Sequence, residues 1–309
     1  MLDRPLGGVV VVEARTLEPP ADAAALCEAL ASLPCVVVGV VAGERAPLTE
    51  LYDVVLEPDD PALPAILETT ATNPHAASAL AVLLRGSEAR STGEGLAAES
   101  AVYSTLQAGP EFAAWRAATP VHSRADTDHP TVRVERTGDQ LLVALSRPEV
   151  HNAFSTRMRD ELLAALELAA ADPSISDVVL TGDGPSFCSG GDLDEFGSRP
   201  DPATAHLVRL ARSVGRALAT ISDRVTARVH GACMGSGIEL PAFAGRVIAR
   251  PDTRIALPEV GMGLIPGAGG TVSLPRRIGR QRTALLALSR ATIDAETALQ
   301  WGLVDEVER

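Results

Sequence analysis

Two glutamates stand in apolar surroundings, where an ionised carboxylate is costly. Glu239 lies between Ile238 and Leu240, and Glu259 lies in a segment, residues 255–271, that is otherwise apolar and rich in Gly and Pro. Burial disfavours the charged form of a carboxyl group, so we expect both pKa values to be raised. A raised pKa is what a general acid or base requires near neutral pH. The two residues therefore predict an acid/base pair.

Two glycine-containing turns each follow a predicted strand. The first, residues 186–196, contains Gly190 and Gly191, and the second, residues 230–240, enters a predicted helix near Ser236. Backbone N–H groups in such turns and at helix N-termini are free to hold an anion or a developing oxyanion. Taken alone, the first turn is read as an ordinary strand-to-helix connection, and the second does not have the GxGxxG spacing of a dinucleotide site. Combined with the two glutamates, the turns predict an oxyanion hole beside an acid/base pair.

Together these segments resemble the crotonase (enoyl-CoA hydratase/isomerase) superfamily. Residues 187–193 look like its first oxyanion motif, residues 231–240 like its second, and residues 258–271 like the block that follows. Residues 147–155 are similar to its N-terminal CoA loop, and residues 293–305 to a later helix and turn. Five blocks in the family's order make the resemblance specific for residues 131–308.

The resemblance implies roles for individual residues. The amides of Gly191 and Ser236 would hold the thioester oxygen of an acyl-CoA, each contributing roughly 3 to 4 kcal/mol to enolate stabilisation by analogy with other oxyanion holes. Glu239 and Glu259 match the two glutamates with which family hydratases activate water and protonate Cα. The other residues expected to contact the substrate or CoA are Arg147, Ala153, Ser189, Gly190, Asp192 and Leu193.

The expected reaction is reversible syn addition of water to a trans-2-enoyl-CoA. Enoyl-CoA isomerase or acyl-CoA hydrolase activity with the same hole, and a non-catalytic subunit of this fold, remain alternatives. No metal or cofactor is expected beyond CoA as part of the substrate, because the thioester itself is the electron sink. The resemblance also implies a homo-oligomer, a trimer or a dimer of trimers.

The chain departs from the family pattern at two positions. Ser236 stands where glycine is usual, which keeps the amide donor but narrows the turn. Asp194 stands where Lys or Arg is frequent, so we expect the cation for the CoA phosphates to come from Arg147 or from the pair Arg276 and Arg277.

The elements that must position these residues alternate between strand and helix patterns. A hairpin is expected at residues 132–145, helices at 156–171 and 205–221, strands at 177–180 and 225–229, and helices at 282–288 and 294–301. This pattern predicts an α/β fold, with a crotonase-like ββα spiral core at residues 131–309. Before it we expect a small α/β segment (1–58), a helical segment (59–120) and a polar linker (121–130).

The segment before the linker has its own predicted organisation. Two Val-rich runs flank a helical pattern at residues 21–33, as in a βαβ unit. Residues 73–84 and 94–115 are similar to the helices that close the family's active site at the C-terminal end. We therefore expect a permuted arrangement, in which residues 60–117 supply the closing helices.

Composition excludes several other classes. The chain has 309 residues and a formal charge of −13, and all its basic residues are Arg. An acidic chain without a basic run is a poor nucleic-acid binder. Its apolar runs fall short of the about 20 residues that span a bilayer, and with no secretory signal visible we expect a cytoplasmic protein. The four dispersed cysteines predict reduced core thiols and no metal site.

Overall fold

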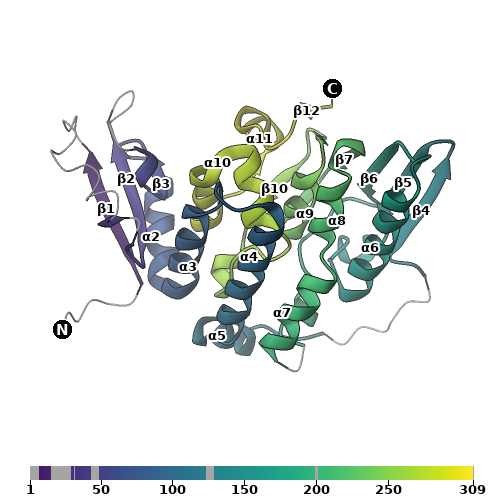
Figure 1. The fold of residues 1–309 in the computed structure, drawn as a ribbon. Coiled ribbons are helices and arrows are strands. Elements are labelled where there is room, and N and C mark those ends of the chain that lie inside the picture. The colour runs from purple at the N-terminus through teal and green to yellow at the C-terminus, as the bar shows by residue number, and fades with distance from the viewer. Residues whose placement is uncertain are drawn as a thin grey trace.

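Three sheets and the helices between them form the molecule. Figure 1 shows the computed structural model, which describes residues 7–14, 29–30, 32–42, 49–122, 129–198 and 201–308. A small sheet lies at one end, the largest sheet lies at the other, and helices fill the space between. The mixed architecture confirms the predicted α/β class.

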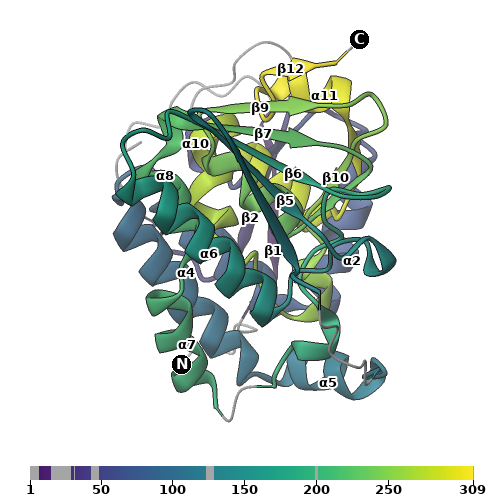
Figure 2. The same cartoon turned by 90° about the vertical axis from the view of Figure 1, so that its right-hand side faces the viewer.

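The largest sheet has six strands in the order β12-β9-β7-β6-β5-β4. It starts with the expected hairpin of β4 (Val132–Thr137) and β5 (Gln140–Leu145), which pair antiparallel. The remaining strands pair in parallel, and Figure 2 shows helices running along the sheet. They are β6 (Asp177–Gly182), β7 (Val225–Val229), β9 (Arg246–Ala249) and β12 (Glu306–Val307). Parallel neighbours require crossover connections, which explains why helices separate these strands in the sequence.

The first crossover helix, α6 (Thr156–Ala171), has the predicted bounds. The Ser155 side chain caps it by accepting a hydrogen bond from the amide of Met158. Met158, Leu162 and Leu166 recur at helical spacing and are fully buried. A cap and an apolar stripe in the sequence therefore fix this element.

Two helix predictions were wrong in extent. The single helix expected at residues 205–221 is divided into α7 (Pro202–Ala211) and α8 (Val214–Thr220), because the Ser213 side chain accepts from the Arg216 amide and starts a new helix. The helix expected near Ser236 is a single turn, α9 (Ser236–Glu239). A 3-10 turn, Pro241–Phe243, follows it, since proline cannot donate to a continuing α-helix.

A second sheet pairs β11 (Ile293–Asp294), β10 (Arg254–Ala256) and β8 (Ala232–Met234). The long helix α10 (Gly270–Ser289) is kinked at Gly279, where φ is 78° and ψ is 159°. The short helix α11 (Ala295–Trp301) follows β11. The two helices predicted for the C-terminal part lie within α10 and α11.

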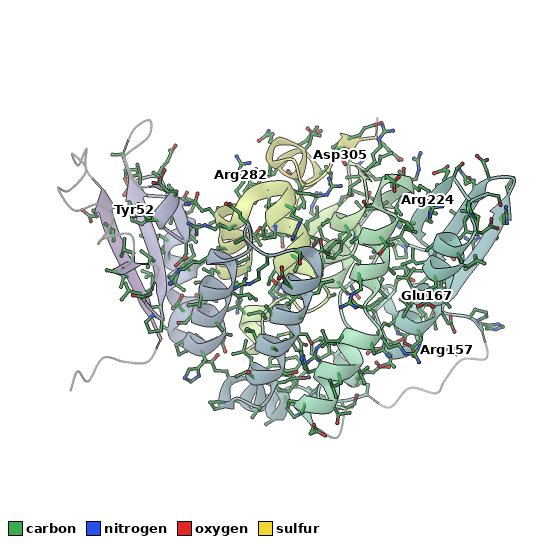
Figure 3. The ribbon with its side chains drawn as sticks, viewed as in Figure 1. Tyr52, Arg157, Glu167, Arg224, Arg282 and Asp305 are labelled. Atoms are coloured by element: carbon green, nitrogen blue, oxygen red, sulfur yellow. The ribbon has the colours of Figure 1, made fainter. Side chains whose placement is uncertain are left out.

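The N-terminal part forms a parallel sheet of β1 (Val9–Ala14), β2 (Val36–Val41) and β3 (Val54–Leu56). The first two strands coincide with the Val-rich runs, whereas β3 was not expected. The helix expected between them at residues 21–33 lies mostly outside the described residues. Tyr52 marks this end of the molecule in Figure 3, and Arg157 and Glu167 mark α6 at the far end.

Four helices connect the small sheet to the core: α2 (Ala62–Thr72), α3 (Pro74–Arg85), α4 (Thr92–Gln107) and α5 (Pro110–Ala118). A buried ion pair, Arg85 Nη2 to Asp53 Oδ2 at 2.7 Å, ties α3 to the small sheet. Helices α2, α3 and α4 all pack on α10, and α4 also packs on α7. The predicted helical segment is thus part of one continuous core with residues 129–308. Among the described helices, none has the length and apolarity to span a bilayer.

Candidate active site

The two glycine-containing turns lie against each other. The amides of Phe187 and Cys188 donate to the carbonyl oxygens of His230 and Ala232, at 2.8 and 3.1 Å. The amide of Met234 returns a hydrogen bond of 3.0 Å to the carbonyl oxygen of Cys188. These bonds bring together two segments that are more than 40 residues apart in the sequence.

Close packing in this layer requires glycine at specific places. A Cβ on Gly237 would lie 2.2 Å from the carbonyl oxygen of Cys188, and Gly190 adopts a φ of +102°. A side chain at the first position would clash with backbone, and at the second it would be strained. The glycines that suggested anion binding are therefore also needed for packing.

Gly191 and Ser236 both line one cavity and carry amides without an acceptor among the described residues. Phe154 pairs with the residues on either side of Gly191, because its amide donates to the Gly190 carbonyl and its carbonyl accepts from the Asp192 amide. Alternation along an extended segment turns the Gly191 amide to the opposite side. Ser236 is the first residue of α9, so its amide has no partner within the helix. Within the described part of the chain, no acceptor is found for either amide, and both residues line the cavity.

Glu239 is held by the loop that starts α10. Its side chain is only 2% exposed, and its Oε2 accepts hydrogen bonds of 2.8 Å from the amides of both Ala268 and Gly270. The Ser273 hydroxyl also donates to the Glu239 backbone carbonyl, at 2.7 Å. The carboxylate is therefore fixed in one orientation.

Glu259 approaches the same point from a 3-10 turn, Glu259–Met262. It is 8% exposed, and its Oε2 is buried without a hydrogen-bond partner among the described residues. A Cβ placed on Gly235 would lie 2.2 Å from Oε1 of Glu259 and 3.6 Å from Oε1 of Glu239. Both carboxyl groups therefore face Gly235, the residue before the Ser236 amide.

A third glutamate, Glu99 on α4, was not predicted from the sequence. It is 2% exposed, and it accepts hydrogen bonds from the Gly269 amide at 2.7 Å and from the amide and hydroxyl of Thr271 at 2.9 and 2.7 Å. Successive amides of one loop thus alternate between Glu239 and Glu99. The only signal in the sequence was a carboxylate on the apolar face of a predicted helix.

Burial raises the pKa values of all three carboxyl groups, and neighbouring carboxylate charges add to this for Glu239 and Glu259. Burial raises the pKa of Glu259 to about 8, and the charge of Glu99 acts in the same direction. Burial likewise raises the pKa of Glu99 to about 7, against its three hydrogen-bond donors and the charge of Arg209. Burial, then the charges of Glu259 and Glu99, raises the pKa of Glu239, whereas its two backbone donors lower it. Such a cluster retains at least one proton near neutral pH.

One cavity of about 230 Å³ contains these groups. The amide-bearing residues Gly191 and Ser236 and the glutamates Glu99, Glu239 and Glu259 all line it. Much of the remaining wall is apolar, formed by Leu96, Phe154, Phe196, Ala205, Val208, Leu210, Val214 and Leu240. Helices α4, α7 and α8 therefore close a chamber whose chemistry comes from the two turns and the Glu259 segment.

The residues expected to contact CoA lie beside the cavity. The Arg147 Nη1 atom donates to the Ala153 carbonyl at 2.6 Å and lies 3.0 Å from Oδ2 of Asp192, so these three residues are joined. Asp192 lines the cavity together with Gly191, whereas Ser189 and Leu193 are exposed outside it and Gly190 is buried between the two turns.

The two departures from the family pattern have local explanations. The Ser236 Oγ lies 3.7 Å from the Cys188 Sγ, so the side chain packs on the first turn. Asp194 accepts from the His122 amide at 2.8 Å. Of the arginines expected to supply a cation instead, Arg276 donates to the carbonyls of Val272 and Arg90, and Arg277 to those of Ala242 and Ala244.

Metal-ligand groups and thiols are the remaining side chains with possible chemistry. In the described part of the chain, no three His, Cys, Asp or Glu side chains are grouped as metal ligands. Cys35, Cys188 and Cys233 are free thiols. Burial raises the pKa of the Cys188 thiol to about 11, so it is a poor nucleophile despite its place beside Ser236.

Comparison with known sequences agrees with this geometry. Residues 137–308 match the family model described as enoyl-CoA hydratase/isomerase. The 2,3-dehydroadipyl-CoA hydratase of Escherichia coli is 36% identical over 174 residues, which cover 56% of this chain and 68% of that protein. The mevalonyl-coenzyme A hydratase SIDH of Beauveria bassiana is 34% identical over 177 residues, covering 54% of this chain and 62% of that protein.

Solved structures of enoyl-CoA hydratases are also similar to this chain. An enoyl-CoA hydratase from Thermoplasma volcanium superposes with a TM-score of 0.54 at 36% identity, covering 58% of this chain and 72% of that one. An enoyl-CoA hydratase from Mycobacterium smegmatis superposes with a TM-score of 0.54 at 30% identity, covering 58% and 70%. The match with the family model covers more than half of the chain, so the protein belongs to the enoyl-CoA hydratase/isomerase family.

Proposed function

We propose that this chain is an enoyl-CoA hydratase that adds water reversibly across the double bond of a trans-2-enoyl-CoA. The single observation that carries this proposal is the placement of Glu239 and Glu259. Both carboxyl groups face Gly235, directly beside the Ser236 amide, inside a mostly apolar cavity. Hydration needs one group to accept a proton from water and another to deliver a proton to carbon.

The Gly191 and Ser236 amides hold the thioester oxygen in this proposal. As water attacks Cβ, negative charge develops on that oxygen, and two preoriented N–H groups stabilise it without reorganising. The surrounding apolar wall strengthens these hydrogen bonds by excluding water. The electrons move from the C=C bond into the thioester carbonyl, which forms an enolate.

The different surroundings of the two glutamates divide the proton transfers between them. Two N–H donors favour the ionised form of Glu239, which takes the proton of the attacking water. Oε2 of Glu259 has no donor among the described residues, so Glu259 keeps the proton and delivers it to Cα as the enolate collapses. A proton passed from Glu239 to Glu259 then restores the starting state.

We also infer that α4 and α5 take the place of helices that close the active site in relatives. Support comes from Glu99, which reaches the loop that orients Glu239, and from α5, which packs on the Glu259 turn. The solved structures above are matched over only about 70% of their length. We also propose that the substrate is an acyl-CoA and that the chain assembles into trimers or dimers of trimers, as in the family. Light scattering of the purified chain would test the assembly.

The test is the loss of conjugated enoyl-thioester absorbance when the protein meets crotonyl-CoA and 2-hexenoyl-CoA. We expect hydration by the wild type and losses of about 10² to 10⁴-fold for Glu239→Gln and for Glu259→Gln, as for removal of a general acid or base. Glu94→Gln, on the exposed first turn of α4, is the matched control.

Failure of the wild type with every acyl length would contradict the proposal. Glu239→Gln with full turnover would point instead to double-bond isomerisation, which can use one carboxylate. Appearance of free thiol in a thiol-reactive dye assay would indicate thioester hydrolysis by the same oxyanion hole.

A further inference from the structure

An arginine on α7 faces the cavity without a carboxylate partner. Arg209 lines the chamber together with the catalytic candidates and is half-buried. Among the described residues, no carboxylate oxygen lies within 4.0 Å of its guanidinium. Glu99 is close enough for their charges to interact, but its two oxygens already accept from Gly269 and Thr271.

Neutral groups hold this guanidinium in place. Its Nε donates to the Ser100 hydroxyl at 3.2 Å and its Nη2 donates to the Ser104 hydroxyl. Its Cζ lies 4.6 Å from the centroid of the Tyr103 ring. Ser100 is fixed in turn, since its hydroxyl lies 2.9 Å from Nδ1 of His206. Nη1 has no acceptor in the described part of the chain, so donors remain for an anion.

The position of Tyr103 relates Arg209 to the reacting end of the cavity. Burial raises the pKa of the Tyr103 hydroxyl most; the charge of Arg209 lowers it, and those of Glu259, Glu239 and Glu99 raise it further. The ring also packs so closely on Gly267 that a Cβ there would lie 2.4 Å from it. Tyr103 thus stacks on Arg209 and lines the same cavity as Glu239 and Glu259.

Other cations near the cavity are placed differently. The Arg159 Nη2 atom pairs with Asp160 Oδ1 at 2.8 Å, and Arg147 pairs with Asp192. Arg212, at the end of α7, is exposed. Arg147 and Arg159 are also half-buried, but of these four arginines only Arg209 combines burial with stacking on an aromatic ring and no carboxylate in salt-bridge contact among the described residues.

We propose that Arg209 binds a carboxylate at the far end of the acyl chain, so that the preferred substrates are 2-enoyl-CoA thioesters of dicarboxylic acids. This inference rests on the proposed hydratase function. A guanidinium that is already oriented and partly desolvated forms strong charge-assisted hydrogen bonds with a carboxylate. A terminal methyl group at the same place would leave the half-buried guanidinium without an anion in contact, so neutral chains of equal length bind less well.

The experiment compares 2-hexenedioyl-CoA with 2-hexenoyl-CoA, which differ only in a terminal carboxylate or methyl group. We expect the wild type to prefer the diacid by about 100-fold in kcat/KM, the size of a desolvated charge pair. In Arg209→Gln the preference falls to one or below, and Arg209→Lys restores part of it. Arg216→Gln removes an equally charged, exposed residue of α8 and serves as the control, with the preference retained.

The five-, seven- and eight-carbon pairs extend the test over acyl length. A wild type that prefers the neutral thioester at every length would overturn the proposal and leave the hydratase intact. Equal losses on both substrates in Arg209→Gln would also overturn it, because a structural role or a contact with CoA phosphates affects both alike.

A binding measurement separates this proposal from the hydratase itself. Calorimetric dissociation constants for adipyl-CoA and hexanoyl-CoA need no turnover. If no enoyl-CoA is hydrated, a diacid preference that Arg209→Gln abolishes would still support the carboxylate site. Equal affinities of the wild type for the two thioesters would reject it.

Discussion

The core at residues 129–308 and the helix α4 contribute to the same cavity in different ways. The core supplies Gly191, Ser236, Glu239 and Glu259, all within motifs where glycine or proline fixes the backbone. Helix α4 supplies Glu99, Ser100 and Tyr103 from regular helix, with no local backbone signature. Functional residues can be recognised in a sequence when they lie in turns whose backbone requires glycine or proline. They are not recognisable when they lie on a regular helix.

The reacting groups lie in the core, whereas α4 carries a residue that positions one of them. In the core, two amides and two carboxyl groups face the cavity, whereas Glu99 faces the loop that orients Glu239. Changes in the core should therefore act on turnover first. Changes in α4 should affect stability and the pH dependence as well as turnover.

The largest effect is expected for Gly235→Ala in the core. The new Cβ would overlap Oε1 of Glu259 at a φ of +48°, so the carboxyl group must move. Because misplacing a catalytic group by about 1 Å can cost 10²-fold or more, we expect hydration of 2-enoyl-CoA to fall by about 10³-fold. Gly138→Ala has the matched strain, at φ +64°, with nothing within 4 Å of its Cβ, and should lose stability only. Equal activity of Gly235→Ala and Gly138→Ala would contradict the assignment of Glu259 as a catalytic group beside Gly235.

The next effect concerns the buried carboxyl groups and pH. Glu259 has a pKa of about 8 in the folded protein against an ordinary value of 4.5. Its contribution to stability is fully present below pH 4.5 and is lost as pH rises through 8. Between pH 5.5 and 7.5 the free energy of unfolding should fall by about 3 kcal/mol more in the wild type than in Glu259→Gln. This follows from about 1.4 kcal/mol for each pH unit over which only the folded state holds the proton. Urea denaturation at both pH values measures this difference, and equal slopes would contradict it.

Glu99→Gln tests the supporting role of α4. The amide side chain cannot accept from both Gly269 and Thr271, so a buried N–H loses its partner at about 1 to 3 kcal/mol. We expect roughly tenfold slower hydration, because a misoriented Glu239 would raise the activation free energy by about 1.4 kcal/mol. Loss of the Glu99 charge lowers the pKa of Glu259, so the alkaline limb of the kcat/KM profile should move to lower pH. If the pH profile of kcat/KM is the same in Glu99→Gln, in the wild type and in the Glu94→Gln control, Glu99 contributes only to folding.

The smallest effect is expected at the start of the same helix. The Ser91 hydroxyl accepts from the Glu94 amide, and the Glu94 carboxylate accepts from the Ser91 amide. Ser91→Ala should cost about 1 kcal/mol of stability, as for other N-caps, and should leave the pH profile of turnover in place. A shifted profile would show that α4 acts on the site through its position alone, without a special role for Glu99.

The sequence by itself determined the family, the α/β core and the candidate reacting groups. Apolar flanks around Glu239 and Glu259, glycines in fixed spacing, and strict periodicity in α6 are local features that folding preserves. It failed where local signals compete: a serine cap divided the helix expected at residues 205–221, and proline stopped α9 after one turn. The assignment of Arg147 to CoA stays a prediction, since its side chain joins Ala153 to Asp192.

Only the tertiary structure decided which residues share the cavity. Glu99 and Gly269 are 170 residues apart, and no periodicity or spacing relates them. Arg209 looked like any helical arginine until the fold placed it against Tyr103 and out of salt-bridge contact with the described carboxylates. Local propensity determines elements, whereas the pairing of buried charges depends on how distant elements pack, because desolvation is set by every group around the site.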